Sequence, residues 1–300
     1  MTSLREALAG ARERLHNAAI PDAGLEAELL LRHALAEYSD FVPPLPISRA
    51  SFFQLQRETL QAEEEARFEA AIARRLVHEP SAYITGHKEF YGLDFLVTPA
   101  ALIPRPETEL LVEHAVGWLA RATRDPGRLL RVADIGTGCG AIAVSVAKAQ
   151  PGAEIYATDV SAQALALAAC NARRHGVASR ISFRHGDLLS PLTCRLDVII
   201  ANLPYIPTED WLRLPPELRD HEPRSALDGG RDGLQAIKAL LDEAPRYLAS
   251  GGIICLEFGQ GQTGALLDYA GAVCPDATIK VHADLAGIDR VLTLESRSVA

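Results

Sequence analysis

Residues 130–140 of the chain read LRVADIGTGCG, an apolar run that changes abruptly into a glycine-rich loop. The apolar run predicts a strand over residues 130–135, and residues 141–149 after the glycines favour a helix. Glycines at such a junction let the backbone pass close to a ligand, and the helix that follows offers free N–H groups. We therefore expect a ligand site where this first strand ends.

Strands and helices alternate on both sides of this stretch. Such alternation is typical of an α/β fold with a mainly parallel sheet and helices on both faces. The connection over residues 206–232 is too long for a simple link, so we expect it to be functional. Further strands are expected at residues 155–159, 181–184, 196–202, 252–257, 277–282 and 290–294, and further helices at 107–120, 161–175, 234–248 and 263–273.

The chain before this region has a different pattern. Residues 1–78 are helical throughout, with apolar residues at helical spacing, and a long third helix is expected from Ser51 to Val77. Residues 88–97 are rich in aromatic and β-branched residues with Gly92 at a turn, which predicts a β-hairpin. We expect two domains, a helical one over residues 1–78 and, over residues 79–300, a hairpin linker followed by the α/β domain.

Composition narrows the class of protein. The chain has 300 residues and a net charge of −9, with 39 acidic against 30 basic residues. This balance argues against long, sequence-independent nucleic-acid binding, which needs Lys and Arg to neutralise phosphates. The five cysteines are scattered and favour reduced thiols in a cytosolic protein without a metal site. We find neither an apolar stretch of membrane-spanning length nor a signal-peptide pattern, so we expect a cytoplasmic protein.

A second unusual stretch follows the apolar run at residues 196–200. That strand ends in Asn202-Leu203-Pro204-Tyr205, which places an amide, a carbonyl and an aromatic ring at the edge of the sheet where ligands bind. Asp159 closes the strand after the glycine loop, at the spacing of an acid that binds ribose hydroxyls. The glycines alone fit both a nicotinamide enzyme and a methyltransferase. Asp134 favours an amino-bearing or cationic ligand over a pyrophosphate.

The order of these motifs resembles the class I S-adenosylmethionine-dependent methyltransferases that modify planar amino groups. A closer resemblance, over nearly the whole chain, is to the peptide chain release factor glutamine N5-methyltransferases (the PrmC/HemK family). It implies a Rossmann-like, seven-stranded, mainly parallel methyltransferase sheet, a β-hairpin linker and a small N-terminal helical bundle for substrate recognition. The motifs that carry it are Tyr83-Ile84-Thr85-Gly86 with Glu89-Phe90, Ile103-Pro104-Arg105-Pro106-Glu107-Thr108-Glu109, His221-Glu222-Pro223-Arg224 with Ala226-Leu227, Gly251-Gly252 and Leu256-Glu257-Phe258-Gly259.

The resemblance also implies the roles of individual residues. S-adenosylmethionine is the expected cofactor and S-adenosylhomocysteine the product, with no metal. The residues implied to bind the methionine part of the cofactor are Asp134, Gly136, Thr137, Gly138, Cys139 and Gly140. Asp159 is implied to bind its ribose, and Asp187 and Leu188 its adenine, and Asn202 is a further cofactor-binding residue. The residues implied to bind the substrate amide and to catalyse the transfer are Asn202, Leu203, Pro204 and Tyr205. Arg105 is a further substrate-binding candidate, and Glu257 is a weaker one.

Two of these residues have a plain structural alternative. Arg105 stands between two prolines and fits a rigid linker as well as a pocket. Asp187 fits a loop cap as well as an adenine site. Leu203 departs from the family, whose tetrapeptide is Asn-Pro-Pro-Tyr. Its carbonyl remains available, but the ring that fixes the backbone is lost.

The expected function is methyl transfer to the N5 amide of a glutamine, in the Gly-Gly-Gln motif of a release factor, which modulates translation termination. The alternatives are a ribosomal protein glutamine, or an adenine amino group of DNA or RNA. A non-catalytic binding module is disfavoured because Asn202, Asp159 and the glycines are all present. A nicotinamide enzyme would leave residues 202–205 without a purpose. We expect a monomer that needs neither direct nucleic-acid contact nor a membrane.

Overall fold

The computed structural model describes residues 2–37, 43–55, 59–122 and 129–297. These residues form two compact units. The first comprises Met1–Lys88 together with Pro215–His221, and the second comprises Glu89–Leu214 and Glu222–Ala300. A short segment from the long connection after residue 206 therefore belongs to the first unit.

The first unit is a bundle of helices around an apolar core. Leu15, Leu30, Leu31 and Ile72 are fully buried there, and Phe68 is 1% exposed. These residues recur at helical spacing, which is why the segments fold as amphipathic helices. The helices are α1 (Leu4–Asn17), α2 (Ala23–Ala34), α3 (Arg49–Phe53), α4 (Ala62–Leu76), α5 (Ser81–Thr85) and α9 (Pro216–His221).

The prediction of one long helix from Ser51 to Val77 is wrong. Helix α3 ends at Phe53 and α4 begins at Ala62, and residues 56–58 lie outside the described part of the chain. The break has a local cause, because the Glu64 carboxylate accepts the backbone N–H of Gln61 at 2.9 Å and so caps a new helix. The acidic residues 63–65 then occupy the first turn, where the helix dipole favours negative charge.

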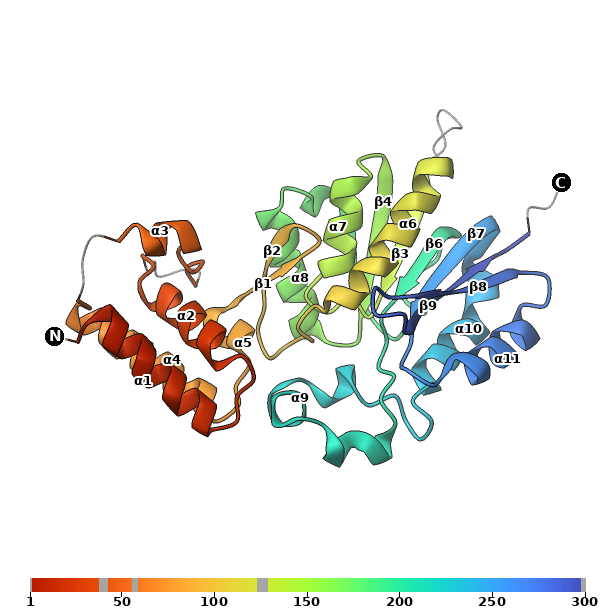
Figure 1. Ribbon diagram of the computed structural model, residues 1–300. Coiled ribbons are helices and arrows are strands. Elements are labelled where there is room, and N and C mark those ends of the chain that lie inside the picture. The colour runs from red at the N-terminus through yellow and green to blue at the C-terminus, as the bar shows by residue number, and fades with distance from the viewer. Residues whose placement is uncertain (1, 38–42, 56–58, 123–128, 298–300) are drawn as a thin grey trace. The chain divides into compact units, whose positions relative to one another are not determined.

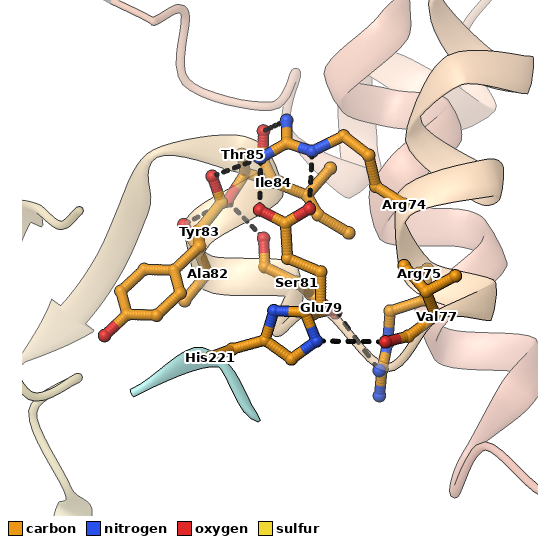
Figure 2. Close-up of polar contacts among 10 residues, drawn as sticks. All are labelled: Arg74, Arg75, Val77, Glu79, Ser81, Ala82, Tyr83, Ile84, Thr85 and His221. Carbon is orange, nitrogen blue, oxygen red and sulfur yellow. Dashed lines mark hydrogen bonds and ion pairs between the residues drawn. The ribbon is translucent and has the colours of Figure 1, made fainter. Parts of the chain in front are cut away.

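The short helix α9 is tied to α4 within the first unit. The Arg75 guanidinium is buried and forms ion pairs with Glu26, at 2.9 Å, and with Glu217 of α9. His221 Nε2 donates to the carbonyl oxygen of Val77 at 2.9 Å, as Figure 2 shows. A buried guanidinium needs both carboxylates, so these contacts fix residues 215–221 firmly within this unit.

The second unit contains the expected mainly parallel sheet of seven strands, in the order β5-β4-β3-β6-β7-β9-β8 (Figure 1). The strands from β5 to β7 in that order are parallel, and β9 is antiparallel to both its neighbours. The predicted hairpin forms a separate two-stranded sheet, β1 (His87–Phe90) and β2 (Leu93–Leu96). The seven strands are β3 (Leu130–Ile135), β4 (Ala153–Asp159), β5 (Ile181–His185), β6 (Leu196–Ala201), β7 (Leu248–Glu257), β8 (Thr278–Ala283) and β9 (Asp289–Glu295).

Helices cover this sheet. Figure 1 shows α6 and α7 across the same face of β3 and β6, and α8 packs beside α7. Ile237 and Leu241 of α10 and Leu266 of α11 join a buried cluster with Ile199 and Leu256 of the sheet. The helices are α6 (Glu109–Ala122), α7 (Ala141–Ala149), α8 (Ala162–Arg174), α10 (Gln235–Tyr247) and α11 (Thr263–Val273), with short 3₁₀ helices η1 (Pro106–Thr108), η2 (Ala178–Arg180), η3 (Thr208–Arg213) and η4 (Arg224–Ala226).

Candidate active site

The carboxyl ends of three neighbouring strands meet at one edge of the sheet. Ile135, the last residue of β3, pairs with Thr158 of β4 on one side and with Ala201 of β6 on the other. Gly136, Asp159 and Asn202 therefore leave the sheet side by side. A cavity of about 460 Å³ opens at this edge, which is within the size range of small-molecule sites.

Most of the predicted site residues line this cavity. They are Arg105, Gly136, Thr137, Gly138, Cys139, Asp159, Asp187, Leu188, Asn202, Leu203 and Pro204. Asp134, Gly140 and Tyr205 are not part of the lining and lie behind it. The cavity also touches Thr108, Pro223 and Ala226, which belong to the quoted motifs but had no predicted role in the site, and Ser225, which belongs to none of those motifs.

The conformation of the glycine loop depends on its three glycines. Gly136, Gly138 and Gly140 all have positive φ angles, of 71°, 56° and 83°. At Gly140 a Cβ atom would lie only 2.9 Å from the Cβ of Ala168, so a larger residue could not be accommodated without a shift of α8. The N–H groups of Gly136 and Thr137 both donate to the Thr158 carbonyl at 2.9 Å, which ties the loop to β4.

Asp134 holds the loop from behind. Its Oδ2 accepts the Thr137 hydroxyl at 2.6 Å and the backbone N–H of Ala143 at 3.0 Å, so it links the loop to the first turn of α7. Burial raises the pKa of this carboxyl to about 7. Its Oδ1 has no hydrogen-bond partner among the described residues. In the structure Asp134 thus orders the loop that lines the cavity.

Asp159 and the loop after β5 form the next part of the wall. Asp159 Oδ2 accepts the N–H of Gly138 at 2.9 Å, and its Oδ1 accepts the N–H of Ser161 at 2.8 Å. Leu188 has a positive φ angle of 43°, and its carbonyl accepts the Thr158 hydroxyl at 3.0 Å. Asp187 is exposed at the rim. The acid that closes β4 therefore organises the glycine loop and faces the cavity at the same time.

Asn202 is held by residues from two other elements. Its side-chain Nδ2 donates to the Thr108 hydroxyl oxygen at 2.9 Å, and that hydroxyl donates to Glu257 Oε2 at 2.7 Å. The Tyr205 hydroxyl donates to Glu257 Oε1 at 3.2 Å. Burial raises the pKa of Glu257 to about 7, and burial together with the nearby Glu257 charge raises the pKa of Tyr205. Glu257 is therefore a buried anchor for both ends of the Asn202–Tyr205 turn.

The turn is also fixed from its other side. Leu203 is only 6% exposed and packs in the core cluster beneath the cavity. Gln262 Nε2 donates to the Tyr205 carbonyl at 2.9 Å. A Cβ atom on Gly229 would lie 2.6 Å from the Pro204 carbonyl oxygen, so only glycine fits against the turn there. These contacts restrain a turn in which Leu203 replaces the first of the two prolines of the family pattern.

Arg105 lines the cavity with its charge already paired. It forms an ion pair with Glu222, whose side chain is 2% exposed, and the other oxygen of Glu222 accepts the N–H of Ile103 at 3.1 Å. The pair joins the two motifs around residues 103–109 and 221–224 at the cavity wall. Among the described residues no group of three or more His, Cys, Asp or Glu side chains is placed to hold a metal ion.

A second hollow, of about 820 Å³, lies on the helical unit between α1 and α2, and it contains none of the predicted site residues. Within the described ranges, the helices are all too short or too polar to cross a membrane.

Comparisons with known proteins show the family of the chain. Residues 109–211 match the family model of the methyltransferase small domain, and residues 6–86 match that of the PrmC N-terminal domain. A protein of Moorella thermoacetica named release factor glutamine methyltransferase is 43% identical, over 96% of this chain and 96% of its own length. The chain belongs to the release factor glutamine methyltransferase family. A protein of the same name from Geobacter sulfurreducens is 40% identical over 97% of this chain and 95% of its own.

A solved methyltransferase structure from Pyrococcus furiosus shares the fold, with a TM-score of 0.51, 17% identity, and coverage of 76% of this chain and 98% of its own. Family membership confirms the resemblance predicted from the motifs, and with it the enzyme class, a methyltransferase.

Proposed function

We propose that the protein transfers the methyl group of S-adenosylmethionine to the side-chain amide nitrogen of a glutamine in a peptide chain release factor. The glutamine is that of the Gly-Gly-Gln motif, the second product is S-adenosylhomocysteine, and the consequence is modulation of translation termination. One observation carries the proposal. Asn202 and the glycine loop open into the same cavity, so a donor and an amide acceptor can meet there.

The residues of the cavity fit the cofactor. Gly136 and Gly138, both with positive φ, line the cavity, and the Asp159 carboxylate is suited to accept hydrogen bonds from ribose hydroxyls. The cavity volume of about 460 Å³ is ample for a nucleoside joined to an amino acid. When bound, the cofactor supplies a methyl group on a positively charged sulfur.

The chain's own residues would act by orientation. An amide nitrogen is a poor nucleophile, because its lone pair is delocalised into the carbonyl group. The Asn202 side-chain oxygen and the Leu203 carbonyl would accept the two amide hydrogens and aim the nitrogen at the methyl group. This is catalysis by positioning and electrostatics without a strong base, and the amide proton that the methyl group replaces would leave to solvent. Pro204 would shape the turn, and Tyr205, which lies behind the cavity, would hold the end of the turn through its hydrogen bond to Glu257.

The helical part of the chain has its own place in the proposal. We assign residues 1–78 to recognition of the release factor and residues 79–300 to the hairpin linker and the methyltransferase domain. The protein acts as a cytoplasmic monomer on a protein loop and requires no direct contact with nucleic acid. The match of residues 6–86 to the PrmC N-terminal domain supports this assignment.

The substrate class is tested by incubating the protein with labelled S-adenosylmethionine and one of three acceptors: a release factor, a ribosomal protein fraction or DNA. We expect label in the release factor alone, and we expect it to disappear when the Gly-Gly-Gln glutamine is replaced by glutamate. Label in DNA alone would overturn the protein-glutamine assignment. Label in the ribosomal fraction alone would move the substrate to a ribosomal protein.

A further inference from the structure

The side-chain amide of Asn202 ends in an oxygen and an NH₂ group, and rotation of the side chain can exchange their positions. In one orientation its oxygen points into the cavity and its NH₂ group points to Thr108, and in the other the two are reversed. Only the first orientation can accept a hydrogen from a substrate amide. The proposed function therefore needs a device that selects it.

The structure contains such a device. Thr108 lies at the end of η1 and is 4% exposed, and its hydroxyl stands between Asn202 Nδ2, at 2.9 Å, and Glu257 Oε2, at 2.7 Å. A hydroxyl group carries a single proton. Since that proton goes to the carboxylate, only the lone pairs of the oxygen remain for Asn202, and they accept from its NH₂ group. The amide oxygen of Asn202 is then left for the cavity.

We propose that Thr108 and Glu257 are positioning residues that lock the Asn202 amide with its oxygen toward the substrate nitrogen. The proposal rests on the proposed function, since it concerns how the same amide acceptor is recognised. Reversal of the amide would bring two oxygen atoms together unless the Thr108 proton left Glu257. Glu257 is 1% exposed, and a buried carboxylate deprived of a donor is costly, so the reversed state is disfavoured.

Glu257 is also held in one place by its surroundings. Its second oxygen accepts from the Tyr205 hydroxyl at 3.2 Å, and the charges of Arg290 and Glu107 act on it from β9 and from η1. The same carboxylate therefore fixes the first and the last residue of the Asn202–Tyr205 turn. A proton on Glu257 would let the Thr108 hydroxyl turn around, so the lock is complete only when Glu257 is ionised.

The test uses Thr108→Val, which keeps the shape of the side chain and removes its hydroxyl. We expect kcat for release factor methylation to fall by about tenfold to a hundredfold, as for a misoriented catalytic group. We expect KM for the release factor and Kd for S-adenosylmethionine to stay within about threefold of wild type, because neither ligand loses a direct contact. Thr108→Ser, which restores the hydroxyl, should recover most of kcat.

The matched control is Thr293→Val. Thr293 is a buried threonine of β9 whose hydroxyl lies 2.8 Å from His282 Nε2 and which is not part of the cavity lining. The Thr293→Val change should leave kcat unchanged, and thermal unfolding of all variants checks that they are folded.

Glu257→Gln supplies a second readout, since burial raises the pKa of Glu257 to about 7. The rise of kcat with pH through that value in the wild type should be absent from this variant.

The outcomes separate the two proposals. A wild-type protein that does not methylate the release factor would overturn the proposed function and, with it, the role of the lock. A wild-type protein that does so, with Thr108→Val at the same kcat or with Thr108→Ser as impaired as Thr108→Val, would overturn the lock alone. A fall in kcat for Thr108→Val that Thr108→Ser reverses would support both.

Discussion

The side chain of Leu203 occupies the space that a side chain on Gly136 would need. A Cβ atom built on Gly136 would lie 3.1 Å from Leu203 Cδ2, and Gly136 has a φ angle of 71°. The two loops that form the cavity, one from β3 and one from β6, thus pack against each other through this pair. The contact makes the shape of the cavity wall at the glycine loop depend on the residue that replaces proline in the Asn202–Tyr205 turn.

We expect Gly136→Ala to weaken the protein and its cofactor site together. The left-handed conformation alone costs an alanine about 1–2 kcal/mol, and the crowding against Leu203 adds to this. Gly271→Ala is the matched control, because Gly271 lies in α11 with no atom within 4 Å of a built Cβ. That change should be neutral or stabilise by about 0.5–1 kcal/mol. Denaturant unfolding and calorimetric titration with S-adenosylmethionine measure both effects, and equal behaviour of the two variants would contradict the packing argument.

Asp159→Ala should act on the cofactor before it acts on the reaction. Its carboxylate lines the cavity and accepts the N–H groups of Gly138 and Ser161, so its loss removes a ribose acceptor and loosens the glycine loop. We expect Kd for S-adenosylmethionine to rise by about ten- to a hundredfold, as for the loss of charge-assisted hydrogen bonds. Asp159→Asn keeps one acceptor oxygen and should fall between. Unchanged Kd in both variants would remove Asp159 from the cofactor site.

Glu257 should make the stability of the protein depend on pH. Burial raises its pKa from an ordinary value of 4.5 to about 7, so between these values the folded protein holds a proton that the unfolded chain releases. The free energy of unfolding therefore falls as pH rises through this window. The Glu257→Gln variant has no carboxyl at this position, so it does not lose this stability. Burial also raises the pKa of Asp134 to about 7, but Asp134 is present in both proteins and its effect cancels in the comparison.

The measurement compares thermal unfolding of wild type and Glu257→Gln at about pH 5 and about pH 8. The difference in Tm, variant minus wild type, should be more positive at the higher pH. A difference that does not change with pH would mean that Glu257 is not a proton-holding group in the folded protein.

Much of the fold could be predicted from the sequence because its signals are local. The strand, the glycines and the helix of residues 130–149 follow one another without interruption, and β4 and β6 end in residues that cannot continue a strand within a sheet core. The seven strands and their mainly parallel pairing follow from that alternation. The signal for the helix break before Ala62 is also local, since Gln61 and Glu64 have the spacing of a capping pair. The helical pattern of apolar residues on both sides of the break nevertheless predicts one continuous helix.

The rest of the site depends on contacts between distant residues. Thr108 reaches Asn202 across 94 positions and Glu257 across 149, and no periodic pattern connects them. In the same way, nothing local indicates that Glu217 pairs with Arg75 and so joins the helical unit. Sequence motifs therefore predicted which residues gather at the cavity, and packing determined which of them face it and which stand behind it.

Asn202 should orient a substrate amide and add little to the affinity for S-adenosylmethionine. The most direct measurement compares wild type and Asn202→Ala in single-turnover methyl transfer to a release factor, with Kd for S-adenosylmethionine measured on both. We expect the rate to fall by about a hundredfold or more, as when a preorganised polar contact of the transition state is lost, while Kd stays within about threefold. An Asn202→Ala protein that transfers methyl at the wild-type rate would show that Asn202 does not orient the substrate amide.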